Sequence, residues 1–568
     1  MAAKEIRLRA LVTVCAFAML AACSAGGGDS SGGPNGSASP SKVNTEADAV
    51  RFLSYGTFGG SPSEINRLID RDAADWLNTE FNRSPTYTLP RLLSEREADG
   101  EIPSNTISHQ YWDQVITAND QLRQRMAFAL SQIFVYSDGP DRDQAQRAYY
   151  QDVLIRNAFG NYRDLLEEIT YSPAMGRYLT YYRNRKGDES NGRMPDENYA
   201  REVLQLFSIG LIELNMDGTP RAGEPETYTN DDIVGLAKVF TGLSGKGEGF
   251  WDADDDADYN PMVMYEDQHS TLEKTFLGTT IPANTPGDES IRIALDAIFE
   301  HPNVAPFISR QLIQRFTSSD PSPAYVERVA TAFENGSFTS FNGRTFGTGQ
   351  RGDLKATLAA VLLEDSLFDA PEDTGLDVSG GKIREPILRF AHMVRAFEYR
   401  NINSANEHRL TDTRDPSNRL GQHPFRSPSV FNFYRPGYIA PNTRSGELGM
   451  TAPELQIVNE SSAVGFNTFM SEFAFDRSPQ REDAQNTFQP NYTDEVALTD
   501  TPAELVDHLA MLLTADRLSG SERESITAIL QELPINTSDA ERELEDRLQI
   551  VGTAITLVTN SPNYAVTW

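Results

Sequence analysis

Apolar residues recur at helical spacing almost throughout the chain from Thr45 onward. The clearest example is the segment 196–210, where four of them fall at i, i+4, i+7 and i+8 and form one stripe along a helix. These four are Tyr199, Val203, Leu206 and Phe207. Gly210 follows where a helix could end in the left-handed conformation. Strand-like alternation is nowhere longer than a few residues, so the pattern predicts an all-α fold with long irregular loops and little or no sheet.

The first 44 residues differ from this pattern. Residues 1–22 combine a basic start with an apolar run that is too short to span a membrane, which is typical of a secretory signal peptide. Their last three residues and the next one read Leu-Ala-Ala-Cys (20–23), which resembles the lipobox of bacterial lipoproteins and implies cleavage before Cys23 and lipidation of that residue. The alternative is ordinary signal-peptide cleavage with an incidental cysteine. Residues 23–44 predict a flexible Gly/Ser/Pro tether.

The tether and signal predict a location in the cell envelope. Ser24, directly after the lipidated residue, favours the outer membrane, with the body on the periplasmic or surface face. The body itself, residues 45–568, exceeds the usual size of one compact domain. We therefore expect either one helical unit or two packed units divided near residues 365–381.

Charge and cysteine content exclude several classes of protein. The 568 residues carry 82 acidic and 50 basic side chains, a formal charge of −32. Nucleic-acid binding depends on basic side chains that neutralise phosphates, so this acidic protein is not expected to bind nucleic acid. Both cysteines lie within the first 23 residues, which excludes disulfides and zinc–thiolate sites from the body.

Several segments, in order along the chain, resemble a large uncharacterised bacterial family known as domain of unknown function 1800. The matching segments are RFLSYGTFG (51–59), RQRMAFALSQIFV (123–135), NYRDLLEEITYSPAM (161–175), ENYAREVLQLFSIG (197–210), HPNVAPFISRQLIQR (301–315), REPILR (384–389) and SPSVFNFYRPGY (427–438). In one branch of the family the second of these carries two histidines, whereas this chain has Ser131 and Ile133 there. The resemblance therefore implies no metal role at these positions. It also implies an exported partner protein with a sulfatase- or phosphatase-like fold.

Glu202 is the first candidate for acid/base chemistry. It lies at the border of the apolar stripe, where a carboxylate is either partnered or shifted in pKa. As a general acid or base, Glu202 would need a second titratable group, and Glu385 is one candidate. The alternatives are a buried ion pair of Glu202 with Arg163 or Arg177, and an ordinary acid before a helix-starting proline for Glu385.

Two histidines, His301 and His423, each precede a proline and are further catalytic candidates near neutral pH. The alternative is that each is a hydrogen-bonding turn residue, which is the more common role of a single histidine in a loop.

Alternating carboxylates form a weak candidate site for a metal ion. They are Asp252, Asp254, Asp256 and Asp258, and their oxygens suit calcium. Ala257 and Val263 stand where an EF-hand loop requires glycine and a bidentate glutamate, so a solvated acidic loop is the alternative. No other cofactor is predicted.

An aromatic-rich segment supplies candidate ligand-stacking residues. These are Phe431, Phe433, Tyr434 and Tyr438, whose ring faces could stack on sugars. The alternative is that the rings are buried against helices.

From these observations we expect an exported, lipid-anchored envelope protein. It would be a component of extracellular polysaccharide or cell-surface processing that acts with a partner enzyme. The alternatives are an acid/base hydrolase that uses Glu202 and a structural scaffold.

Overall fold

The computed structural model describes residues 42–96, 100–137, 143–368, 381–401, 410, 412–475 and 488–567. The predicted signal peptide, Cys23 and most of the tether lie outside the described residues. The end of the predicted tether is folded: Lys42–Val43 form β1, which pairs with β2 (Arg71–Asp72), and Val43 is buried. The folded body therefore begins slightly before residue 45.

The fold is all-α, as predicted. The N-terminal part contains α2 (Glu46–Gly56), α3 (Pro62–Leu68), α4 (Ala73–Phe81), α5 (Leu89–Ser94), α6 (Thr106–Thr117), α7 (Gln121–Ser131), α8 (Gln144–Asn157), α9 (Tyr162–Thr170) and α10 (Pro173–Tyr178). The middle contains α11 (Asn198–Gln205), α12 (Asn230–Val239), α13 (Gly287–Phe299), α14 (Val304–Phe316), α15 (Pro323–Asn335), α16 (Leu354–Leu362) and α17 (Pro386–Ala396). The C-terminal part contains α18 (Arg444–Glu447), α19 (Glu460–Ala474), α20 (Thr493–Ala497), α21 (Pro502–Thr514), α22 (Gly520–Gln531), α23 (Ala540–Thr559) and α24 (Pro562–Ala565).

Sheet structure in the described residues is limited to short antiparallel pairs. Besides β1–β2, the pairs are β3 (Leu243–Ser244) with β6 (Val263–Met264), β4 (Gly247–Gly249) with β5 (Asp252–Ala253), β7 (Lys274–Phe276) with β8 (Thr279–Ile281), β9 (Phe338–Thr339) with β10 (Thr345–Phe346), β11 (Lys382–Ile383) with β14 (Val566–Thr567), and β12 (Arg400–Asn401) with β13 (Phe488–Gln489). Short 3-10 helices lie at Ala257–Tyr259, Asp365–Leu367 and Pro453–Ile457. The β11–β14 pair ties the end of the chain to the start of α17.

Helix starts follow ordinary capping chemistry. At α3 the Ser61 hydroxyl accepts the backbone N–H of Glu64, and the Glu64 carboxylate accepts the backbone N–H of Ser61 at 2.9 Å. At α12 Thr229 and Asp232 form the same reciprocal pair. These caps satisfy N–H groups that a helix end otherwise leaves without partners.

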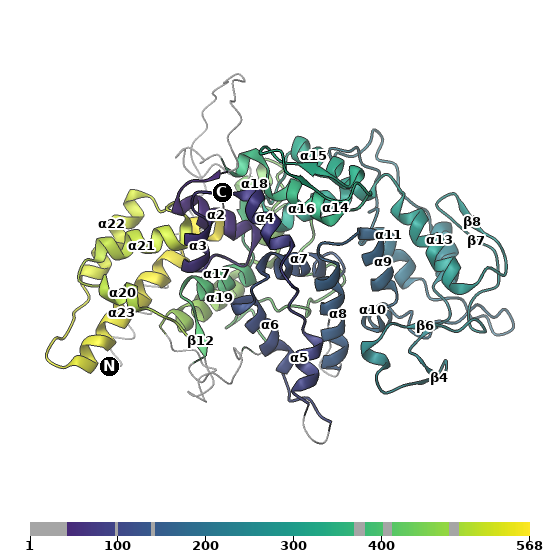
Figure 1. The fold of residues 1–568 in the computed structure, drawn as a ribbon, viewed down its shortest axis with the longest axis horizontal. Helices are drawn as coiled ribbons and strands as arrows, with labels where there is room; N and C mark the ends of the chain where they lie inside the picture. The colour runs from purple at the N-terminus through teal and green to yellow at the C-terminus, as the bar shows by residue number, and fades with distance from the viewer. Residues whose placement is uncertain are drawn as a thin grey trace.

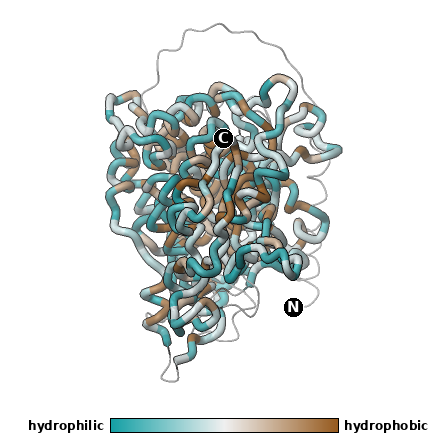
Figure 2. The backbone as a smooth tube through the Cα atoms, turned by 90° about the vertical axis from the view of Figure 1, so that its right-hand side faces the viewer, coloured by the Kyte–Doolittle hydropathy of each residue, from teal (hydrophilic) through white to brown (hydrophobic). Residues whose placement is uncertain are grey.

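The helices form an elongated body with the C-terminal helices α21, α22 and α23 at one end and α13 with the β7–β8 hairpin at the other (Figure 1). Hydrophobic backbone segments concentrate in the middle of the molecule, and hydrophilic ones surround them (Figure 2). One cluster of buried apolar side chains runs from Val43 to Tyr564 and includes Val361 and Ile387, on either side of residues 369–380. The buried core is thus continuous between the two halves of the chain.

The longest helix in the described part of the chain is α23, which has 20 residues. Its first turn alone carries the acidic side chains Glu541 and Glu543. Within the described ranges, no helix combines the length and the apolar character that crossing a membrane requires.

Candidate functional site

A groove of about 380 Å³ lies between the end of α11, one face of α14 and the aromatic-rich segment 427–438, which we call the aromatic loop. From α11 and the turn after it come Gln205, Leu206, Gly210, Leu211, Ile212 and Leu214. From α14 come Phe307, Arg310, Gln311, Gln314 and Arg315, and from the aromatic loop Val430, Phe431, Tyr434, Arg435, Pro436 and Gly437. A cavity of this size accommodates a small ligand.

The turn after α11 forms one wall of the groove and depends on a glycine. Gly210 adopts φ +70°, the left-handed conformation that its position in the sequence predicts, although the helix itself ends earlier, at Gln205. A Cβ at this position would lie 2.6 Å from the ring of Phe307, which also lines the groove. Only glycine fits both requirements.

Asn303, directly before α14, fixes this wall from behind. Its Nδ2 donates to the carbonyls of Ile209, at 2.6 Å, and Ile212, at 2.9 Å, and its Oδ1 accepts the N–H of Leu214 at 2.6 Å. Asn303 is buried. One side chain therefore satisfies three backbone groups of a turn that has no regular helix or strand of its own.

Glu385 anchors the aromatic loop on the opposite wall. It is 1% exposed at the N-terminus of α17, and its Oε2 accepts hydrogen bonds from Gln132 Nε2 at 2.8 Å, from the Tyr434 hydroxyl at 3.0 Å and from Gln422 Nε2. Gln132 and Tyr434 both line the groove. The structure thus places Glu385 behind the groove as a buried support rather than at its surface.

The four predicted stacking residues have different environments. Tyr434 is buried, and burial together with Glu385 raises the pKa of its hydroxyl well above the usual range. Phe433 and Tyr438 are partly buried and do not line the groove. Phe431 lines the groove and is 36% exposed, with the Arg435 guanidinium 4.7 Å from its ring centre. The stacking prediction therefore fits Phe431 best.

Three arginines face the groove, and none of them forms an ion pair among the described residues. Arg315 is buried and donates to the carbonyls of Gln311, at 3.0 Å, and Gln132, at 2.9 Å. Arg310 is half-buried, and burial lowers the pKa of its guanidinium although Asp320 partly opposes this. Arg435 is exposed. No carboxylate belongs to the described lining of the groove.

A fourth arginine lies beneath this surface. Arg125 on α7 is fully buried and donates to the carbonyl of Arg315. Burial lowers the pKa of Arg125 to about 10, against the opposing influence of Glu385 and two tyrosines. The buried charge behind the groove therefore includes two guanidinium groups and one carboxylate.

Glu202 lies on α11 but does not line the groove. It is 7% exposed, its Oε2 has no hydrogen-bond partner within the described structure, and burial raises its pKa while Arg201 partly opposes the shift. It shares no hydrogen-bond partner with Glu385 in the described part of the chain. The structure thus does not join the two carboxylates into the acid/base pair that we considered.

Within the described residues, Glu202 forms no ion pair with either of the two arginines considered, Arg163 and Arg177. Arg163 instead contacts Asp296 at 2.7 Å and Glu167 at 2.6 Å, and Arg177 pairs with Asp258. Arg163 is thus paired both within its own helix and with a distant helix, and Arg177 is paired with a residue 81 positions away.

The two histidine candidates are held by local hydrogen bonds. His301 accepts the backbone N–H of Asn303 on its Nδ1 at 3.2 Å, and burial lowers its pKa. His423 is fully buried, with Thr413 N–H 3.3 Å from its Nδ1 and the Ser108 hydroxyl 3.3 Å from its Nε2. Burial and Arg147 hold the pKa of His423 well below its usual range. Neither ring lines the groove.

The predicted calcium loop does not gather its carboxylates. Asp252 belongs to β5, and Asp258 lies in the 3-10 helix that follows, where it pairs with Arg177. Within the described ranges, no three or more His, Cys, Asp or Glu side chains are arranged to hold a metal ion. The geometry therefore matches the acidic-loop alternative, because a calcium site needs about six to eight oxygens around one point.

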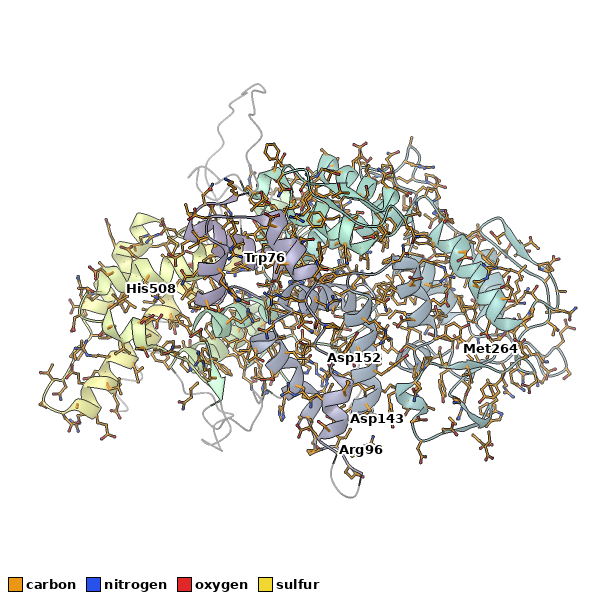
Figure 3. All side chains as sticks on the ribbon, viewed as in Figure 1. Trp76, Arg96, Asp143, Asp152, Met264 and His508 are labelled. Carbon is orange, nitrogen blue, oxygen red and sulfur yellow. The ribbon has the colours of Figure 1, made fainter. Side chains whose placement is uncertain are left out.

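A second cavity, of about 550 Å³, lies beside α4 (Figure 3 labels Trp76 on this helix). One helical face lines it with Asp75, Trp76, Thr79 and Glu80, and Glu64 from α3 also contributes. Burial raises the pKa of Glu80, which Arg83 partly opposes, whereas Arg395 and Ser61 outweigh burial and lower the pKa of Glu64. Two carboxylates with opposite shifts thus line one cavity, a pattern that acid/base catalysts use.

This cavity was not among the sites predicted from the sequence. The spacing of Asp75, Trp76, Thr79 and Glu80 along one helical face was the available signal. The contact between Glu64 and Arg395 could not be predicted, because the two residues are 331 positions apart in sequence.

Together these observations define a large all-helical protein with a ligand-sized groove supported by a buried polar network. The family model described as "Protein of unknown function (DUF1800)" matches residues 51–566, nearly the whole chain, and the chain belongs to this family. No curated protein and no solved structure matches the chain.

Proposed function

We propose that this protein binds saccharides in the groove between α11, α14 and the aromatic loop. The observation that carries the proposal is the combination of a partly exposed aromatic ring, Phe431, with planar polar side chains in a groove of about 380 Å³. Sugars present apolar ring faces that stack on aromatics and hydroxyls that bond to amide and guanidinium groups.

Unpartnered polar atoms support the same proposal. Gln311 Nε2 and Gln314 Oε1, both on deeply buried side chains of the groove, have no hydrogen-bond partner in the described part of the chain. Buried polar atoms are nearly always hydrogen-bonded in folded proteins. A ligand rich in hydroxyl groups would provide partners after small side-chain rotations.

The cellular setting is part of the proposal. The signal-like residues 1–22, the lipobox ending at Cys23 and the polar tether support an exported, lipid-anchored envelope protein. There it would take part in extracellular polysaccharide or cell-surface processing, with a sulfatase- or phosphatase-like exported partner as the enzyme. A purely structural scaffold is the alternative if the groove binds no saccharide.

The test compares the mature chain with Phe431→Ala in affinity electrophoresis through gels that contain neutral or acidic polysaccharides. Phe341→Ala is the matched control, because Phe341 is also exposed but lies between β9 and β10, outside the groove. We expect one class of polysaccharide to retard the wild type and the control, and to bind Phe431→Ala roughly fivefold more weakly, since stacking contributes about 1 kcal/mol. Equal retardation of all three proteins, or no retardation at all, would contradict the proposal.

The second candidate function is an acid/base hydrolase, and its site moves from Glu202 to the cavity beside α4. Glu80, whose pKa is raised by burial, would donate a proton to the glycosidic oxygen, and Glu64, whose pKa is lowered, would act as the carboxylate that activates water. Release of reducing ends by the wild type and by Glu202→Gln, but not by Glu80→Gln, would support this function. Release that is unaffected by Glu80→Gln would exclude it.

A further inference from the structure

We propose that the ligand of the groove is an acidic saccharide whose carboxylate or sulfate group is held by Arg310 and Arg435. This inference rests on the proposed saccharide binding and adds the chemical class of the ligand. It begins from an imbalance of charge around the groove.

The arginines of the groove differ from many others in this chain. Arg163, Arg292, Arg523 and Arg547, for example, each contact two carboxylates. Arg310 and Arg435 have no ion-pair partner within the described residues, and their guanidinium groups donate no hydrogen bond there. Asp320 acts electrostatically on Arg310 but forms no ion pair with it in the described structure, so in a chain with 82 acidic side chains both guanidinium groups can still pair with an anion from outside.

The charges beneath the groove favour the same sign of ligand. Arg125 and Arg315 are buried there with Glu385, and no carboxylate belongs to the described lining. Low local dielectric strengthens attraction between these cations and an anion in the groove. An isolated carboxylate or sulfate would therefore be stabilised here, although the whole protein repels anions at long range.

The position of Arg435 links the charge to the sugar ring. Its guanidinium lies over the Phe431 ring, 4.7 Å from the ring centre, so a cation and the proposed stacking side chain occupy the same part of the groove. Arg310 faces the same groove from α14. Guanidinium groups bind carboxylate and sulfate oxygens through paired hydrogen bonds, which lysine cannot reproduce. A ring that carries one acidic group fits both features at once.

Isothermal titration calorimetry on the mature chain tests this inference with matched probes. Oligogalacturonate and its fully methyl-esterified form share their rings and differ in charge, and sulfated and unsulfated dextran oligosaccharides provide the second pair. We expect one acidic member to bind at least tenfold more tightly than its neutral counterpart. The pair that shows this difference identifies the acidic group as carboxylate or sulfate.

Two variants and a control assign the effect to the groove. Arg435→Gln changes an exposed side chain and Arg310→Gln a half-buried one, whereas Arg96→Gln changes an exposed arginine just after α5 (Figure 3). We expect each groove variant to weaken acidic binding about fivefold or more and neutral binding by clearly less, so that the ratio of acidic to neutral affinity falls, with Arg96→Gln like the wild type.

The two proposals fail in different ways. Equal binding of the acidic and neutral members, sensitive to Phe431→Ala, would overturn this inference and leave saccharide binding intact. Acidic preference that survives both arginine variants would also overturn it, because the charge would then be recognised elsewhere. Absence of binding by every probe would contradict both proposals.

Discussion

At the level of single residues, the two carboxylates Glu202 and Glu385 show how environment separates similar side chains. Both are buried, yet Glu385 accepts hydrogen bonds from three side chains, whereas Glu202 has an oxygen with no partner in the described structure. A buried acceptor without a hydrogen-bond partner destabilises the folded state, whereas one whose hydrogen bonds are formed stabilises it. Glu385 is therefore a structural support, and Glu202 is a destabilising position.

Replacing Glu202 by Gln should keep or increase stability near pH 7. Burial raises the pKa of Glu202 above its usual 4.5, so the folded state favours the protonated carboxyl. Its contribution to stability is then fully present below pH 4.5 and is lost as pH rises through the folded-state pKa. We expect Glu202→Gln to gain up to about 1 kcal/mol at pH 7 in urea denaturation, and no gain near about pH 4. A loss of more than about 1 kcal/mol at pH 7 would show that the charged carboxylate has a stabilising partner.

Replacing Tyr434 by Phe should destabilise the aromatic loop. The change removes a hydroxyl that donates to Glu385 at 3.0 Å, and hydrogen bonds to charged groups contribute about 1.5–3 kcal/mol. Tyr438→Phe is the control, because its hydroxyl forms no hydrogen bond within the described residues. Denaturation that detects equal losses for both variants would argue against the Glu385 network.

At the level of elements, the groove depends on a turn and a loop that lack regular structure. The turn after α11 is held by Gly210 and Asn303, and the aromatic loop by Glu385. Such segments are precise only where side chains satisfy their backbone groups. The supports of the groove are therefore as important as the residues that face it.

Replacing Asn303 by Ala should affect both stability and binding. The variant removes the side-chain partner of three backbone groups, one buried and two partly buried, so we expect a loss of about 2–4 kcal/mol and weaker saccharide binding. Asn342→Ala, at an exposed position between β9 and β10, is the control. If Asn303→Ala unfolds at the same urea concentration as the control, the turn is held by other contacts.

Helical periodicity predicted the fold class, because it depends on amphipathic faces that form locally. The left-handed conformation of Gly210 was predictable from its position directly after the apolar stripe of residues 199–207. Long-range partners were not predictable in this way. Arg163 and Arg177 each had many possible carboxylate partners, and the observed ones, Asp296 and Asp258, lie far along the chain. The aspartates of the loop 252–258 are not gathered around one point in the described structure, because alternation in sequence does not by itself curve a backbone around an ion.

At the level of the whole molecule, the groove is assembled from four distant parts of the chain, around residues 132, 205–214, 307–315 and 430–437. A continuous core holds these parts together. No spacing rule within one segment predicts such an assembly, because it depends on how helices pack. The sequence could therefore indicate Phe431 and Glu385 as candidates, but not that Glu385 supports the loop that carries Phe431.

The most direct test of the saccharide proposal is a crystal structure of the mature chain soaked with the oligosaccharide that binds most tightly in calorimetry. We predict a sugar ring against Phe431, with its acidic group within hydrogen-bonding distance of Arg310 or Arg435. A ligand found instead beside Trp76 in the cavity of α4, or a groove that stays empty while the protein binds the sugar in solution, would contradict it.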